Sequence, residues 1–371
     1  MKKCKKDHKI FIAVFLCIPF LVSAQFHTLK IPRSSNKVIE TQQLGVTDVT
    51  IDYSSPSVNN REVWNDIEVI PQSGDPIAWR AGANMNTTIY FSTDVLIEGK
   101  VLKAGTYGFH IIPNDNNFTL LFAHNNNQWG SYYLDREKDV TMEVKVQGEE
   151  CPFSEKLDYE FLNWSEDSVT IALEWADKRI PFKVSIDLNK TVIESFRNEL
   201  RGINTYHWQA WNDAASWCLQ HNTNLEEALE WANRSIQGGY HGFAAEENLT
   251  NLVTKARLLK KLNKDDDLTT TLEQAEHLVS NPREANMISF LMLQLEQPKK
   301  ALDFSNGMLV KYPDAWFLNI NKGISFYFMG QKEEALKELR AVAEIAPEQF
   351  QKRLGEIIQE VTEDTYKMPN G

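Results

Sequence analysis

Apolar and polar residues alternate through the chain from about residue 38 to residue 188. The segment VTDVTIDY (46–53) is one example, and TTIYF, GTYGFHII, FTLLFAH and SVTIALEW follow with the same character. A period of two residues is typical of half-buried β-strands. Short turn segments such as PNDNN and SEDS separate them, so we expect the strands to be antiparallel. About nine such strands predict a β-sandwich or a partly open barrel.

After Lys190 the pattern changes to the period of a helix. In TYHWQAWNDAASWCLQ, Trp208, Trp211, Ala215 and Cys218 fall on one stripe. Helical patterns then continue to the C-terminus, with breaks at QGGYHG, NKDDD, NPRE and KYPD. The sequence therefore predicts an antiparallel β-sandwich-like domain over residues 25–189 and an all-α domain over 190–371, each large enough to form a core.

The helical half contains a repeat. Three positions recur 34 residues later at a common spacing of 12 residues: Ser289, Ala301 and Pro313, then Gly323, Ala335 and Pro347. This spacing is similar to that of the tetratricopeptide repeat, a pair of antiparallel helices. In that repeat the small residues allow the two helices to approach closely, and the proline ends the second helix. The resemblance implies a curved array with a concave side; an irregular helical bundle is the alternative.

The first helix of each unit lines the concave side in the family that this region resembles. In the last clear unit that helix is AWFLNINKGISFYF, where Asn319, Lys322 and Phe326 share one face. Asparagine and lysine can hold a peptide backbone or a carboxylate, and an aromatic residue can anchor a side chain. We therefore expect a protein or peptide partner at this face. The alternative is that the face packs against a closing helix at 348–362.

The first 24 residues have the pattern of a secretory signal peptide. Four lysines between positions 2 and 6 precede an apolar run of 13 residues, IFIAVFLCIPFLV, which is too short to span a membrane. Small residues end at Ala24, so cleavage is expected before Gln25, with an uncleaved anchor as the alternative. The mature chain is then expected to be exported to the periplasm or the extracellular space, without stable insertion in a membrane.

The charge of the chain argues against some classes of partner, and its cysteine content argues against a disulfide. Removing residues 1–24 takes away five lysines and one aspartate and changes the formal net charge from -12 to -16. An acidic chain without a basic cluster argues against nucleic acid and anionic membranes as partners. The remaining cysteines, Cys151 and Cys218, fall in different predicted domains, so we expect buried free thiols rather than a disulfide. The oligomeric state stays open.

Several motifs in the strand half resemble a bacterial family known as domain of unknown function 2911. Its boxes, in order, match Tyr53–Ser57, Trp79–Asn84, Gly99–Tyr107 and Gln128–Gly130. Two positions depart from the family pattern: His110 replaces a small or apolar residue, and Asn60 replaces a glycine that precedes Arg61. The resemblance implies a fold and an exported setting but no established activity.

Arg80 is the leading candidate for a functional residue in the strand half. It stands between Trp79 and Gly82 in AWRAGANMNTTIYF, so we expect a partly buried guanidinium. Such a group needs acceptors, and Asp48, Asp52 or Asp94 are the expected partners if Arg80 only orders the loop. Alternatively, Arg80 could clamp a carboxylate or phosphate. Asn84 is expected either to cap this loop or to adopt a positive φ, and otherwise to contribute to the site.

The histidines do not predict a metal site, and no cofactor is predicted. A hairpin turn around Asp115 would place His110 opposite Leu120, which leaves His110 and His124 roughly 13 Å apart at the rise of a strand. The sequence also lacks HExxH, GxSxG, the P-loop and GxGxxG. The asparagine-rich turns lack the alternating acidic ligands of a calcium loop.

Trp129, followed by Tyr132 and Tyr133, offers two interpretations. A tryptophan beside Asn and Gln is typical of a sugar-binding platform, but large aromatic residues also plug the rim of a sandwich. Taken together, the sequence favours an exported, non-enzymatic binding or scaffolding protein that binds its partner through the helical repeats. The alternative is a periplasmic hydrolase or carbohydrate-binding protein that uses the Arg80 and Asn84 loop, with His110.

Overall fold

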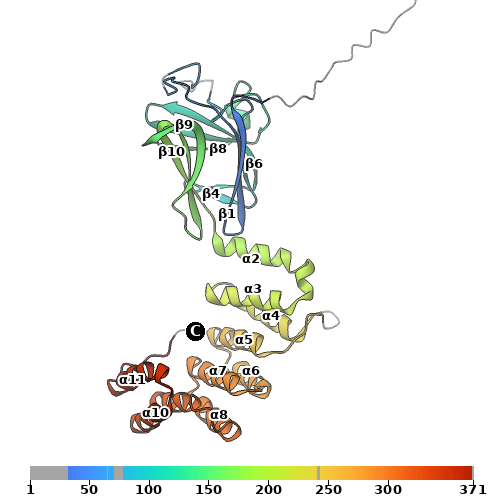
Figure 1. Ribbon diagram of the computed structural model, residues 1–371. Coiled ribbons are helices and arrows are strands. Elements are labelled where there is room, and N and C mark those ends of the chain that lie inside the picture. The colour runs from blue at the N-terminus through green and yellow to red at the C-terminus, as the bar shows by residue number, and fades with distance from the viewer. Residues whose placement is uncertain (1–31, 65, 71–77, 240–242, 370–371) are drawn as a thin grey trace, which may run out of the picture.

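The computed structural model describes residues 32–64, 66–70, 78–239 and 243–369. A strand region is followed by a stack of helices, and the helix after the last strand leads from one region into the other (Figure 1). The signal peptide expected at residues 1–24 lies outside the described residues. None of the described helices is long and apolar enough to span a lipid bilayer.

The strands of the described region form two antiparallel sheets. The first has six strands, in the order β1 (Asn36–Leu44), β2 (Thr47–Ser55), β3 (Thr87–Phe91), β6 (Gly105–Asn114), β7 (Asn117–Ala123) and β8 (Val140–Gln147). The second has four, in the order β5 (Lys100–Leu102), β4 (Val95–Ile97), β10 (Ser168–Ser185) and β9 (Glu149–Leu162). A short helix, α1 (Arg136–Asp139), precedes β8. The prediction of an antiparallel β-sandwich is confirmed.

Alternation along the strands builds the core between the two sheets. In β2 the apolar residues Val49, Ile51 and Tyr53 are buried, and the polar residues between them are not fully buried. They pack in one cluster with Phe109 of the first sheet and Phe182 of the second. Burial of large apolar surface on both inner faces is the main stabilising contribution in such a sandwich.

The register of the β6–β7 hairpin differs from the predicted one by one residue. His110 lies opposite Leu121, not Leu120, because Asn114 pairs with Asn117 and the turn contains only Asp115 and Asn116. Asp115 has a φ of 53°, as tight two-residue hairpins require. His124 follows the end of β7. The described residues contain no group of three or more His, Cys, Asp or Glu side chains that could hold a metal ion.

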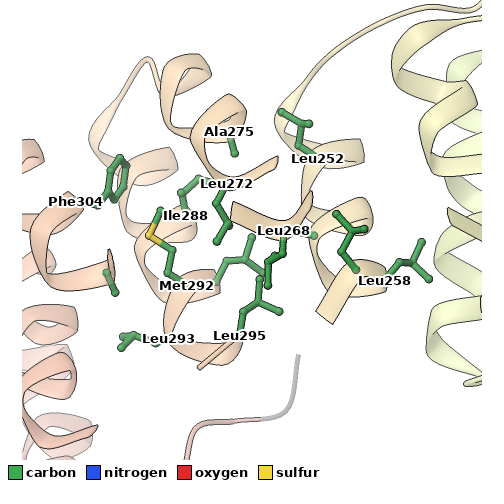
Figure 2. Packing of buried hydrophobic residues seen from close by; sticks show 14 of the residues in the cluster. Leu252, Leu258, Leu268, Leu272, Ala275, Ile288, Met292, Leu293, Leu295 and Phe304 are labelled. Atoms are coloured by element: carbon green, nitrogen blue, oxygen red, sulfur yellow. The ribbon is translucent and has the colours of Figure 1, made fainter. Parts of the chain in front are cut away.

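The helical half is built from helices that pack on their neighbours in the chain. The helices are α2 (Leu188–Glu199), α3 (Trp208–Gln220), α4 (Leu225–Gln237), α5 (Leu249–Lys261), α6 (Asp265–Leu278), α7 (Pro282–Gln294), α8 (Pro298–Lys311), α9 (Leu318–Phe328), α10 (Lys332–Ile345) and α11 (Glu348–Thr362). Alternate helices such as α3 and α5, or α7 and α9, also touch. Figure 2 shows part of the resulting core, where Leu272 of α6 and Met292 of α7 are buried. The prediction of a tetratricopeptide-like helical region is confirmed.

The small residues of the repeat lie where two helices are in close contact. A Cβ atom on Gly323 of α9 would come 2.7 Å from Leu339 Cγ of α10. At the equivalent place one unit earlier, the buried Ser289 hydroxyl lies 2.6 Å from that of Ser305 in α8. Both positions therefore require a small side chain. Pro347 begins the turn into α11, two residues after the end of α10.

The change from strand to helix takes place between Ser185 and Leu188. The expected domain division at Asn189 therefore falls in the first turn of α2, whose N-terminus is capped by the side chain of Asp187. Leu188 packs against the core of the sandwich, whereas Ile193 belongs to the helical core. Independent folding of the two halves stays a proposal.

The two cysteines among the described residues, Cys151 and Cys218, are free. Cys218 in α3 is fully buried, and burial raises the pKa of its thiol to about 11. Cys151 in β9 is partly exposed, so the expectation of a buried thiol holds for Cys218 but not for Cys151.

Replacing Gly323 with alanine should destabilise the helical half. The added methyl group would separate α9 from α10, and overpacking of this kind costs about 1–3 kcal/mol of unfolding free energy. Gly307 in α8 is the matched control, because a Cβ there meets no atom within 4 Å. Gly307→Ala should stabilise the protein by about 0.5–1 kcal/mol through helix propensity. Chemical denaturation of both variants measures the difference, and equal effects would contradict close packing at Gly323.

Candidate functional site

Loops at the end of the sandwich where β2 ends and β3 begins enclose a cavity of about 800 Å³. It is lined by segments near 34–35, 56–61, 67–69, 78–84 and 131–132, together with Trp175 of β10. The helical half continues from the other end, where the β1–β2 turn at Gly45 meets Ile186 and Leu188. We call this hollow the Arg80 cavity.

The loop that carries Arg80 is fixed by hydrogen bonds to both sheets. The Ala81 carbonyl accepts one from Tyr159 Oη of β9 and one from Thr87 Oγ1 of β3, each at 2.9 Å. Ala83 N also donates to Ser54 O at 3.1 Å. Ala81 is buried and has a φ of 52°, which is uncommon for alanine. A residue keeps such a conformation only when its surroundings hold it there, and these bonds do so.

Arg80 does not pair with any of the expected carboxylates. Its Nη1 donates to the carbonyl oxygen of Asn84 at 2.5 Å, and its guanidinium lies 5.6 Å from the centre of the Tyr132 ring. Among the described residues it forms no ion pair. The guanidinium therefore remains partly buried at the edge of the cavity, with N–H groups that have no acceptor among the described residues.

The three aspartates are engaged elsewhere, so that expectation is wrong. Asp52 pairs with Lys37 at 2.9 Å, and Asp94 pairs with Lys103 at 2.8 Å. Asp48 accepts a hydrogen bond from Gln43 at 3.4 Å. Each aspartate is paired with a side chain that lies close to it in the fold. The spacing of these residues in the sequence did not predict the pairs.

Asn84 organises the loop through its backbone. Its φ is 63°, which agrees with the expected positive value, and its carbonyl accepts hydrogen bonds from Arg80 and from Gly130 N, the latter at 3.2 Å. Gly130 has a φ of 67°, and a Cβ there would lie 2.8 Å from Arg80 Nη2. The Trp129–Gly130 turn thus packs directly against the guanidinium.

His110 is fully buried on β6 and reaches the cavity through Ser131. Its Nδ1 lies 2.6 Å from Ser131 Oγ, and Gln128 Nε2 lies 3.4 Å from its Nε2. Burial and the positive charge of Arg80 lower the pKa of His110 to about 4. A serine nucleophile needs a histidine that becomes protonated as it takes the proton, and this environment disfavours the protonated ring. The surroundings of His110 therefore favour a role for Ser131 as a hydrogen-bonding hydroxyl and not as a nucleophile.

The structure thus brings three of the predicted residues, Arg80, Asn84 and His110, to one place. Ser131 and Gln128 complete the cluster and were missed, although Gln128 begins the Gln128–Gly130 box. Ser131 could not be recognised as a site residue from the sequence, because a serine after a turn is common. Only the folding of the 124–131 segment over the outer face of β6 places it beside His110.

Trp129 lines a second hollow of about 970 Å³ next to the first. The two share Ser35 and Asn84, and the second is also lined by Asn86 and Asn126. Trp129 is 48% exposed, which favours a surface platform over a plug at the rim of the sandwich.

A third hollow, of about 490 Å³, lies in the helical half. It is formed by α7, α9, α11 and the segment after α11, and its lining is mostly aromatic and aliphatic: Phe290, Trp316, Phe317, Ile320, Ile324, Phe350, Ile357 and Tyr366. We call it the helical groove. The first helices of the two clear units, α7 and α9, therefore line it, as the repeat resemblance implies.

The three residues expected at the concave face do not line this groove. Lys322 Nζ lies 3.2 Å from Glu338 of α10, and Phe326 packs against the helical core. Asn319 is partly exposed and lies outside the lining. Lys322 is directed towards α10, and the groove is lined instead by Ile320 and Ile324, which lie on a different face of α9.

Replacing Arg80 with alanine should change the free energy of unfolding by less than about 1 kcal/mol, because the lost bond is to a carbonyl that keeps Gly130 as a donor. Arg179→Ala is the control. Arg179 pairs with Glu174 at 2.6 Å, so its loss should cost about 1.5–3 kcal/mol. Urea denaturation measures the free energy of unfolding of both variants. A loss at Arg80 that equals or exceeds the loss at Arg179 would indicate that Arg80 has a purely structural role.

Comparison with known proteins bears on the strand half. A search of curated proteins finds no match. Among solved structures, a similar chain is that of "Crystal structure of YrrB: a TPR protein with an unusual peptide-binding site", with 17% sequence identity. That similarity covers 47% of this chain and 87% of the other, at a TM-score of 0.29, so the account of the helices rests on their own geometry. Residues 34–184, which span nearly all of the two sheets, match the family described as "Protein of unknown function (DUF2911)".

Proposed function

We propose that the chain is an exported, non-enzymatic binding or scaffolding protein that holds a peptide segment of a partner in the helical groove. The observation that carries this proposal is an apolar hollow lined by aromatic side chains from α7, from the segment before α9, from α11 and from the segment after it. Phe350 in this groove is 42% exposed and stacks edge-on against Trp316 at 5.3 Å. Solvent-exposed aromatic residues in a concave site are typical anchors for a partner.

The polar rim of the groove supports a peptide as the occupant. Asn321 Nδ2 donates to Asn286 Oδ1 at 3.1 Å, and both residues line the groove, so its wall carries amide groups beside the aromatic ones. Arg283 is also at the rim and forms no ion pair within the described residues. It would favour a carboxylate on the peptide.

The C-terminal segment of the chain, which contributes Tyr366 and Pro369 to the groove, illustrates how the helices beside the groove hold an extended segment. After α11, the buried Tyr366 packs against Tyr327 and Phe328, each with ring centres 6.0 Å apart. Farther on, the Pro369 carbonyl accepts a hydrogen bond from Gln294 Nε2 at 3.0 Å. An aromatic anchor and a backbone bond to an amide are the two contacts expected of a bound peptide. The proposed occupant is therefore an extended segment with a large apolar side chain beside a carboxylate.

Selection from a displayed peptide library on the full mature chain tests the groove. Enriched peptides should carry an aromatic or large aliphatic residue next to Asp or Glu. Phe350→Ala should weaken the best peptide about tenfold or more, because it removes an exposed anchor from the groove. Fluorescence anisotropy with the synthetic peptide measures the change.

The double variant Asn319→Ala and Lys322→Ala is the control for this experiment. It alters the adjoining face of the same helix and should leave peptide affinity within about twofold. Binding that survives Phe350→Ala but fails in the double variant would return the site to the face predicted from sequence. A library that yields no binder would oppose the proposal itself.

Export is proposed from the N-terminal sequence alone. The basic residues, the apolar run and the small residues ending at Ala24 support cleavage before Gln25. Intact mass of the protein recovered from the periplasm or the medium should correspond to a chain beginning at Gln25. A recovered mass that includes residues 1–24 would contradict cleavage.

A further inference from the structure

We propose that the Arg80 cavity binds a small organic or inorganic oxyanion, a carboxylate or a phosphate, on the guanidinium of Arg80. This site is separate from the helical groove, and it would give the strand half a ligand of its own. The first argument is the state of Arg80 itself. Of its several N–H groups, one has an acceptor in the described protein, the Asn84 carbonyl. A partly buried guanidinium is otherwise expected to have its donors satisfied.

The rest of the cavity wall is also rich in hydrogen-bond donors. Arg61 also lines it and is held in place by the backbone, with Nη2 on Ser57 O at 2.7 Å and Nε on Val58 O at 3.0 Å. The Ser57 and Ser131 side chains belong to the same wall, whereas Glu68 is the carboxylate among the described lining residues. Two guanidinium groups against one carboxylate make this a locally basic site on a chain of net charge -12.

A third observation concerns Trp175, which lies on the inner side of the cavity. Its ring stacks on that of Trp79 at 5.9 Å, and Trp79 also lines the cavity. The buried Nε1–H of Trp175 has no hydrogen-bond acceptor in the structure. An unsatisfied buried donor is unusual in a folded protein, and here it belongs to a residue of the cavity wall.

The loop geometry explains why the site would be ready before the ligand arrives. Ala81 and Asn84 both have positive φ values, and hydrogen bonds from Tyr159, Thr87 and Gly130 hold their carbonyls. The backbone is therefore fixed around Arg80 without help from a ligand. Pre-organisation of this kind reduces the entropy lost on binding and is typical of sites that hold a small charged group.

His110 supplies an independent readout of binding at this place. It lies next to Ser131 of the cavity wall, and the Arg80 charge is one cause of its lowered pKa of about 4. An anion on Arg80 would offset that charge, so the pKa of His110 should rise towards its ordinary value. A pH titration of the histidine ring signals by NMR, with and without ligand, detects this change.

The test uses the full mature chain and two probes, inorganic phosphate and acetate, in isothermal titration calorimetry at low ionic strength. At least one probe should bind, and Arg80→Gln should weaken it by roughly 10- to 100-fold. Arg80→Lys should retain more affinity than Arg80→Gln because it keeps the charge. Binding of phosphate alone or of acetate alone would assign the class of oxyanion.

Two further variants test whether binding takes place at the Arg80 cavity. Arg340→Gln, at an exposed position of α10 that lines neither the Arg80 cavity nor the helical groove, should leave the affinity unchanged. Gly130→Ala should reduce it, because the added Cβ would displace Arg80 Nη2. The proposal is overturned if neither probe binds, if Arg80→Gln binds as well as the original chain, or if binding leaves the His110 titration unchanged.

Discussion

The carbonyl group of Ala81 is the point on which the strand half depends. It lies in a loop that leads into β3 of the six-stranded sheet, yet one of its two hydrogen-bond donors, Tyr159, belongs to the four-stranded sheet. The bond therefore ties the loop to both layers of the sandwich. It also keeps Ala81 in the left-handed region, and this directs the preceding Arg80 to the cavity and not to a carboxylate on the sheet. The loop consequently presents Arg80 to solvent-accessible space.

The helical half uses a different constraint, the close approach of paired helices. Gly323 and the Ser289–Ser305 contact bring second helices against first helices. Large side chains such as Trp316 and Phe350 then line the groove on the side of the first helices. Each half thus has its own kind of hollow: a polar, arginine-lined cavity in the sandwich and an apolar groove among the helices. We propose that these two hollows hold a small anion and a peptide, respectively, through separate surfaces.

The sequence predicted the architecture well because periodicity is a local property. Alternation in β2 and the 34-residue recurrence of Gly323 follow directly from which face of an element is buried. The sites were harder to predict because they depend on contacts between distant segments. Nothing near Asp52 in sequence showed that Lys37 would take its carboxylate. The turn chemistry of a hairpin fixes its register, and a turn of two residues moved the partner of His110 by one position.

The residues that line the helical groove were also hard to predict, because the sequence does not show which face of α9 is turned towards the groove. Asn319, Lys322 and Phe326 do share a face, but the sequence alone did not show that Glu338 of α10 would draw Lys322 away from the groove. At about 100° per residue, a rotation of roughly 150° about the helix axis separates that face from the lining residues Ile320 and Ile324. Likewise, Ser131 became part of the Arg80 cavity only through the path of the 124–131 segment.

Native-state amide hydrogen exchange of the free mature chain tests the central claim, that the Arg80 loop is fixed before any ligand binds. The amides of Ala83 and Asn86 donate to Ser54 O and Gln128 O, so they should exchange as slowly as the amides within β3. Slow exchange at these positions in the absence of ligand would support a pre-organised loop. Exchange at the rate of an open loop, with β3 still protected, would contradict the account.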